Sequence, residues 1–108
     1  MSKVKIVTFV PADYAATVRQ AMGDAGAGAQ GDYSHCSFSS VGIGRFTPQD
    51  GAKPFIGDVG TPEEVQEERI EVICERSEAK TVIAAMRAAH PYEEVAFDII
   101  PLLSEEEL

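Results

Sequence analysis

The sequence has no tryptophan, only two cysteines and two histidines, and no long apolar run. The cysteines, Cys36 and Cys74, stand far apart and form no C-x-x-C motif, which favours reduced thiols over a disulfide framework. No run approaches the length of a membrane span, and the first residues carry no apolar segment typical of a signal peptide. We therefore expect a cytoplasmic protein without a membrane partner.

Basic residues are also scarce, with nine Lys and Arg against eighteen Asp and Glu and a net charge of -9. Binding to a polyphosphate backbone needs a cationic surface, so nucleic acid is not an expected partner. The length of 108 residues, with 44% hydrophobic and 25% charged residues, is typical of one globular domain. We expect a single domain over residues 1–108, in which 104–108 form a solvated acidic tail.

Hydrophobic periodicity predicts four strands and two helices. Their expected ranges, in the order strand, helix, strand, strand, helix, strand, are 3–10, 14–25, 33–40, 69–75, 79–89 and 95–100. Ser77 is a good N-cap residue for the second helix, and Cys74 is expected to be a buried small hydrophobe. The strongly acidic segment 61–68 is expected to be a solvated connector.

A glycine-punctuated excursion, residues 42–57, is expected as an inserted hairpin between the second and third strands. Its two phenylalanines, Phe46 and Phe55, suit a subunit interface, or they fold back onto the domain. The glycine-rich turn at 26–31 follows a helix instead of opening one, so it does not have the geometry of a phosphate-binding loop.

The order of elements gives two β-α-β halves, which indicates an α+β protein with a ferredoxin-like βαββαβ sandwich. In that fold both helices cover one face of an antiparallel sheet. The predicted strands carry apolar residues on both faces, as Ile6 and Val7 illustrate. We therefore expect the second face to pack against another copy of the chain, as a dimer or trimer.

The candidate site is the segment His90-Pro91-Tyr92-Glu93-Glu94. Proline disfavours helical geometry in the preceding residue, so the second helix should end at His90. There the partial negative charge of the last helical carbonyls favours the cationic imidazole. Imidazole beside carboxylates suits zinc or copper, so His90, Glu93 and Glu94 are candidate ligands.

His35 or Cys36 could join these ligands through folding or across an interface. In the expected strand 33–40 the two side chains point to opposite faces, so they cannot bind one metal ion as a local pair. Three other interpretations remain open. In the first, His90 caps the helix while the glutamates are solvated; in the second, it acts as a general base with Tyr92 orienting a substrate; in the third, the domain is a purely structural adaptor.

Several ordered motifs together resemble one known family. They are Tyr33-x-x-Cys36-Ser37-Phe38, Gly42-x-Gly44-x-Phe46-x-Pro48, Gly51-Ala52-x-Pro54-Phe55-Ile56-Gly57, Arg69-Ile70-Glu71 and the stretch from His90 to Ile99. The combination is similar to the inserted domain of the NGG-interacting factor three family, the YqfO-like proteins, whose fold resembles that of the PII and CutA proteins. The resemblance covers nearly the whole chain, from Lys3 to Leu103.

The resemblance implies a PII/CutA-like fold, which commonly forms trimers and binds small ligands or metal ions at subunit clefts. Members of the family carry this insert between two halves of a larger domain with a two-metal site. The sequence has two histidines and neither half, so the resemblance implies a stand-alone insert without that site or its hydrolase activity. We expect a non-enzymatic homo-oligomer that binds a divalent metal ion, a small ligand or a protein partner.

Overall fold

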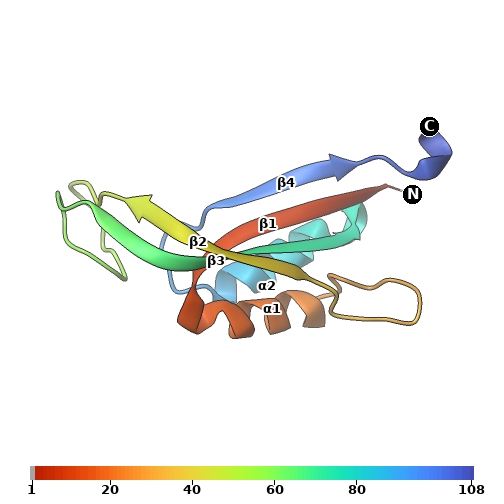
Figure 1. The fold of residues 1–108 in the computed structure, drawn as a ribbon, viewed down its shortest axis with the longest axis horizontal. Helices are drawn as coiled ribbons and strands as arrows, with labels where there is room; N and C mark the ends of the chain where they lie inside the picture. The colour runs from red at the N-terminus through yellow and green to blue at the C-terminus, as the bar shows by residue number, and fades with distance from the viewer. Residues whose placement is uncertain (1) are drawn as a thin grey trace.

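Four antiparallel strands form one sheet, and two helices pack on it in the computed structural model, which describes residues 2–108 (Figure 1). The sheet order is β2-β3-β1-β4, which confirms the predicted α+β ferredoxin-like sandwich. The elements are β1 Lys3–Pro11, η1 Ala12–Tyr14, α1 Ala15–Asp24, β2 Phe38–Phe46, β3 Glu63–Glu75, η2 Arg76–Glu78, α2 Ala79–Ala89, β4 Phe97–Leu102 and η3 Glu105–Glu107.

The core lies between the two helices and one face of the sheet. Strand register places Ile6 of β1 beside Val72 of β3 and Ile99 of β4, and side chains opposite each other in a ladder share a face. The inner face of β1 and β3 joins both helices in one buried cluster, whose largest fully buried members are Ile6, Val10, Val18, Met22, Ile70, Val82 and Met86. Cys74 belongs to this cluster, as its position in the sequence predicts.

The second strand begins at Phe38, so the expected strand over 33–40 is wrong in its first half. Residues 33–37 form a loop that returns to the end of α1: the Cys36 N–H donates to the Gly28 carbonyl across 3.0 Å. His35 has a φ of 58°, a left-handed conformation that lies outside the β region of regular strands. The expectation that His35 and Cys36 point to opposite faces of a strand is therefore wrong as well.

Strand β3 begins at Glu63, so the expected solvated connector over 61–68 is wrong. Its acidic residues continue the ladder with β2, where Gly44 lies opposite Val65. Two arginines offset the acidic charge: Arg45 forms a 2.6 Å ion pair with Glu64, and Arg19 forms one with Glu68. The glycine-rich excursion is thus a hairpin made by β2 and β3 themselves, and only residues 47–62, the β2–β3 loop, lie outside strands.

Ser77 does not cap α2, contrary to the sequence-based prediction. It lies inside the 3-10 turn η2, and Glu78 occupies the N-cap position without a side-chain capping bond. The turn itself supplies a backbone bond, from the Ala79 N–H to the Arg76 carbonyl, so a side-chain cap is not needed there.

The molecule is elongated, with extents of 49 × 25 × 23 Å and a radius of gyration of 15.1 Å. A compact domain of this size has a radius of gyration of about 13 Å. The difference arises because β2 and β3 extend past the helices as a two-stranded arm, while β4 and the C-terminal turn extend the other way (Figure 1). Among the described residues, no helix combines the length and apolar character that a membrane span requires.

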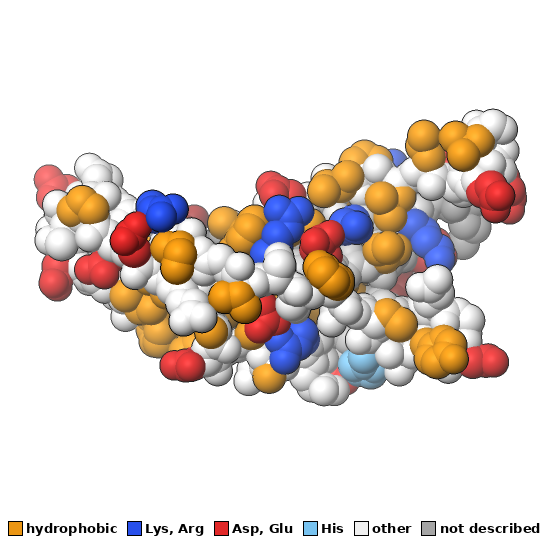
Figure 2. Space-filling model, in the orientation of Figure 1, with side chains coloured by type: hydrophobic (Ala, Val, Ile, Leu, Met, Phe, Trp, Pro, Cys, Tyr) orange, Lys and Arg blue, Asp and Glu red, His pale blue; other side chains and the backbone are white. Residues whose placement is uncertain are grey.

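The sheet face away from the helices, called here the open face, mixes charged and apolar side chains. The Lys5 ammonium lies 3.1 Å from Glu71, and the Arg69 guanidinium lies 3.5 Å from the same carboxylate. Val7, which is opposite Glu71 in the ladder, is fully buried beside this charge network. Three open-face apolar side chains are exposed: Phe38, Ile73 and Ile100. Figure 2 likewise shows hydrophobic side chains interspersed with charged ones along the molecule.

Candidate functional site

The hinge, defined as residues 90–96 between α2 and β4, begins where the proline rule places it. His90 is the C-cap of α2 with an extended backbone (φ -81°, ψ 137°), and its N–H still donates to the Met86 carbonyl. The expected end of the helix is confirmed. From His90 the chain turns and joins the edge of the sheet at Phe97, which pairs with Thr8 of β1.

The His90 ring connects the hinge to the end of β1. Its Nε2 lies 2.7 Å from the Phe9 carbonyl oxygen, and the Tyr92 N–H lies 3.1 Å from its Nδ1. Because a carbonyl only accepts and an amide N–H only donates, Nε2 carries the proton and Nδ1 offers its lone pair. The residue is 7% exposed. Both nitrogens of this buried imidazole therefore form hydrogen bonds within the protein, one to β1 and one within the hinge.

Burial lowers the pKa of His90, and the Phe9 carbonyl and nearby Glu67 only partly oppose this shift. The sequence-based expectation that the helix terminus favours the cation is therefore wrong for this residue. Desolvation of the charged form outweighs the attraction of the last carbonyls because the ring lies inside the fold. The neutral tautomer with the proton on Nε2 is the one that fits both hydrogen bonds.

Tyr92 contacts a carboxylate that the sequence did not single out. Its hydroxyl donates to Glu67 Oε2 across 2.9 Å, and its ring packs edge-on against Phe46 with centroids 5.8 Å apart. Burial, followed by the neighbouring Glu67 carboxylate, raises the pKa of Tyr92 above its usual range, which keeps the phenol protonated. The glutamate is 8% exposed, and Gly44 makes room for it, because a Cβ at Gly44 would collide with its carboxylate.

These residues border a cavity of about 550 Å³, called here the hinge pocket. Its walls come from the end of β2, the β2–β3 loop and the hinge, with Phe9 and Glu67 contributed by the central strands. Most of the lining is aromatic or aliphatic, including Phe9, Ile43, Phe46, Pro54, Phe55, Ile56 and Tyr92. Such a cavity, apolar with few polar groups, is typical of a small-molecule site.

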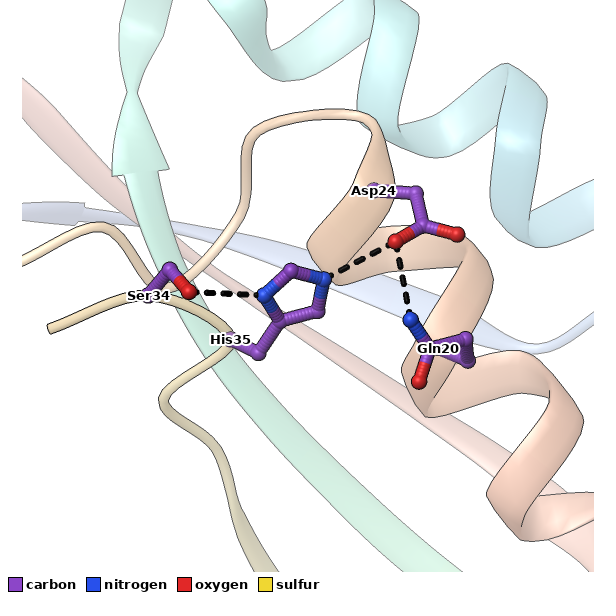
Figure 3. Close-up of polar contacts among 4 residues, drawn as sticks. All are labelled: Gln20, Asp24, Ser34 and His35. Atoms are coloured by element: carbon purple, nitrogen blue, oxygen red, sulfur yellow. Dashed lines mark hydrogen bonds and ion pairs between the residues drawn. The ribbon is translucent and has the colours of Figure 1, made fainter.

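The other residues predicted as metal ligands lie in two separate places. Glu93 and Glu94 are at the pocket rim, where the Glu93 carboxylate accepts the Lys53 N–H across 2.8 Å. His35 lies beside the C-terminal end of α1. Its Nε2 is 2.9 Å from Asp24 Oδ1, and its Nδ1 is 2.9 Å from Ser34 Oγ (Figure 3). Cys36 follows it in the same exposed loop.

The fold therefore does not gather the five predicted ligands in one copy of the chain. Over residues 2–108, no three His, Cys, Asp or Glu side chains are placed to share a metal ion. As folded here, His90 also has both ring nitrogens in hydrogen bonds, so it fits a ligand role only if the hinge rearranges. Zinc or copper binding by these residues stays a prediction.

Phe46 and Phe55 both contact aromatic rings of their own chain. Phe46 packs on Tyr92, and Phe55 meets Tyr14 of η1 edge-on with centroids 5.5 Å apart. Of the two interpretations of the sequence, the structure supports folding back onto the domain. Phe55 nevertheless stays 50% exposed, so the β2–β3 loop presents apolar surface at the mouth of the pocket.

Sequence reasoning missed Glu67 because it stands in a run of acidic residues that resembles a solvated connector. A signal was present: if the alternation of β3 is extended backwards from Ile70, Val65 falls on the opposite face, which is the face of Glu67, and so places an apolar strand residue beside it. Extending the strand by that rule places Glu67 on the open face beside β2. Its proximity to Tyr92 depends on the path of the hinge, which no local pattern encodes.

Comparison with known proteins identifies relatives, although no family model matches the chain. A Bacillus subtilis protein named "GTP cyclohydrolase 1 type 2 homolog" is 57% identical over 98 residues, which are 91% of this chain and 26% of that protein. The chain thus spans about a quarter of the curated relatives it matches.

Solved structures agree with this relationship. The structure of a Bacillus cereus protein related to NIF3 superposes with a TM-score of 0.83 and 51% identity, covering 95% of this chain and 26% of that one. The CutA protein of Archaeoglobus fulgidus matches with a TM-score of 0.69 and 16% identity, covering 98% and 91%, which is a likeness of fold alone. The chain therefore corresponds to the PII/CutA-like domain of the NIF3-related, YqfO-like family, as its motifs indicate.

Proposed function

We propose that this domain is a non-enzymatic, self-associating module that binds a small organic ligand in the hinge pocket. The observation that carries the proposal is the pocket itself: about 550 Å³, lined mostly by aromatic and aliphatic side chains, with one acidic residue, Glu67, that is more than nine-tenths buried. Ligand sites in proteins have volumes of about 300–1,000 Å³ and the same mixture of apolar walls and few polar groups.

A binding role is favoured over catalysis by the state of the polar groups at the hinge. His90 does not line the pocket, and its ring nitrogens hold Phe9 and Tyr92, so it is not positioned as a general base. The Tyr92 phenol is kept protonated by burial and by its bond to Glu67. Any activity implied by the name of the relatives concerns proteins about four times as long.

The test of ligand binding uses 2-phenylethanol, a neutral probe with an aromatic ring. Titration into ¹⁵N-labelled protein should give saturable shifts at the amides of Gly44, Phe46 and Lys53. Ala52→Trp should abolish them, because Ala52 lines the pocket and an indole there would fill it. The matched control is Ala84→Trp on the exposed side of α2, which should leave binding unchanged. Absence of saturable shifts in the parent protein would contradict the proposal.

Self-association is supported by two features of the sheet. Both outer strands, β2 and β4, have one edge without a neighbouring strand in the described fold, and such edges readily pair with another chain. The apolar side chains Phe38, Ile73 and Ile100 are 67%, 39% and 41% exposed on the open face. A second copy that covers them would bury this surface and complete the elongated fold as a dimer or trimer.

Native mass spectrometry and light scattering at about 10 µM test this part. We expect a dimer or trimer, and we expect Phe38→Ser to shift the population towards the monomer. Val59→Ser is the control, because Val59 is 47% exposed in the β2–β3 loop, away from the open face. A parent protein that is monomeric at this concentration would remove self-association from the proposal without affecting the pocket.

A further inference from the structure

The hinge pocket has a distinctive combination of charge and burial. Among its lining residues, three are acidic, Glu67, Glu93 and Glu94, and one is basic, Arg45. The Arg45 guanidinium is held 2.6 Å from Glu64, outside the lining, so its charge is already balanced. The acidic groups of the pocket therefore have no cation of their own in the described part of the cavity wall.

Glu67 differs from the two rim glutamates in its surroundings. It is 8% exposed, whereas both rim residues are exposed, and the one side-chain hydrogen bond recorded for it comes from the Tyr92 hydroxyl. A buried carboxylate interacts strongly with a cation that replaces its lost solvation, because the local dielectric constant is low. A neutral ligand that displaced water from this carboxylate would instead leave it further desolvated.

The rings around Glu67 add a second attraction for a cation. Phe9, Phe46 and Tyr92 line the same cavity, and a cation within about 6 Å of a ring centre is attracted by the ring face. Phe9 already takes part in such a contact, with the Arg69 guanidinium 5.8 Å from its centroid. The pocket thus offers an aromatic enclosure and one deep negative charge.

The geometry points to a small organic amine as the ligand class, with its apolar body against Phe46 and Phe55 and its ammonium group on the Glu67 carboxylate. This inference rests on the proposed function, because it specifies which ligand the same pocket takes. Tyr92 acts as a positioning residue, since its hydroxyl fixes the carboxylate through Oε2, and Oε1, which lies beside Gly44, is the oxygen assigned to the ligand. Ligands that carry a carboxylate should bind weakly, because their negative charge is repelled by Glu67.

Three probes of similar size and different charge test whether the pocket selects a ligand by its charge: phenethylamine, 2-phenylethanol and 3-phenylpropionate. Their dissociation constants are measured by NMR titration of the whole chain at pH 7.5 and low salt. We expect phenethylamine to bind about tenfold or more tightly than the alcohol, and the carboxylate to bind least. Glu67→Gln, whose amide oxygen can still accept from Tyr92, should reduce the preference for the amine to about twofold or less, whereas Glu93→Gln should preserve most of it.

The outcomes distinguish this inference from the proposed function. Equal affinities for amine and alcohol would overturn the amine assignment while leaving the pocket as a binding site. If neither probe binds, the proposed function fails and the inference fails with it. If zinc chloride alone reproduces the shifts of phenethylamine at the pocket amides, the site takes a metal ion and the amine assignment is overturned. Should Glu67→Gln not fold, equal binding of amine and carboxylate to the parent protein would be sufficient to overturn it.

Discussion

The Tyr92 hydroxyl and the Glu67 carboxylate, 25 positions apart in the sequence, lie 2.9 Å from each other and fasten the hinge to strand β3. The contact places a buried negative charge in a pocket whose lining is mostly apolar. It also explains how a short segment after α2 can define a cavity wall: His90 fixes the hinge to β1, and Tyr92 fixes it to β3.

Removing the Tyr92 hydroxyl should destabilise the protein. Tyr92→Phe keeps the ring on Phe46 but leaves Glu67 without its donor, and leaving a buried acceptor unsatisfied costs about 1–3 kcal/mol. We expect a loss of that size in the free energy of unfolding, measured by urea denaturation. Tyr33→Phe is the control, because Tyr33 is 75% exposed, and it should change little. Equal effects of the two substitutions would contradict the role given to Tyr92.

Two glycines of β2 offer a matched pair. A Cβ at Gly44 would collide with the Glu67 carboxylate, whereas a Cβ at Gly42 would point into open space. Glu67 is buried and held by Tyr92, so Gly44→Ala should cost about 1–3 kcal/mol, the range for inserting atoms into a packed site. Gly42→Ala should be within about 0.5 kcal/mol of the parent protein. Urea denaturation measures the free energy of unfolding of both variants. A similar loss in both would show that the Glu67 side chain moves aside freely.

The stability of the fold should depend on pH through His90. Its folded-state pKa lies below the unfolded value of about 6.5, so the native state favours the neutral ring. Stability from this residue is therefore fully present above pH 6.5 and is lost as the pH falls through 6.5 towards the folded pKa. We expect the urea midpoint to fall between pH 7.5 and 5.5 and the fall to become smaller in His90→Gln, whose overall stability is lower. An unchanged slope in that variant would assign the effect to other groups.

The two thiols should differ in reactivity. Cys36 is exposed, whereas Cys74 is buried in the core, where desolvation and then the charges of Glu78 and Glu75 raise its pKa. A thiol reagent should therefore label one cysteine rapidly in the native protein and the second only after denaturation. Cys36→Ser should remove the rapid phase. Rapid labelling of both thiols would indicate that the core opens readily around β3.

The sequence was sufficient to predict the fold and the hinge but not the pocket. Period-two runs such as Val4 to Val10 and the proline after His90 are local signals, and the structure confirms the elements they predict. The sequence does not reveal the start of β3, because its acidic residues are typical of a solvated segment. The arginines that balance their charge, Arg19 and Arg45, come close only in the folded protein. The same long-range pairing hides Glu67.

The histidine predictions show the same limit. Sequence placed His90 correctly at the helix end, but whether its ring faces solvent or the core depends on contacts with Phe9 that are 81 positions away. Likewise, His35 was assigned to a strand, although the positive φ of a loop residue has no simple signature when the residue is not glycine. Local patterns therefore predict where chain segments change direction more reliably than what their side chains meet.

The most direct test of the account is a crystal structure of the protein grown with phenethylamine. We predict the aromatic ring of the amine in the hinge pocket against Phe46 and its nitrogen about 3 Å from a carboxylate oxygen of Glu67. An amine found elsewhere, or a pocket filled by side chains of a second copy of the chain, would contradict the proposal that this cavity is a ligand site.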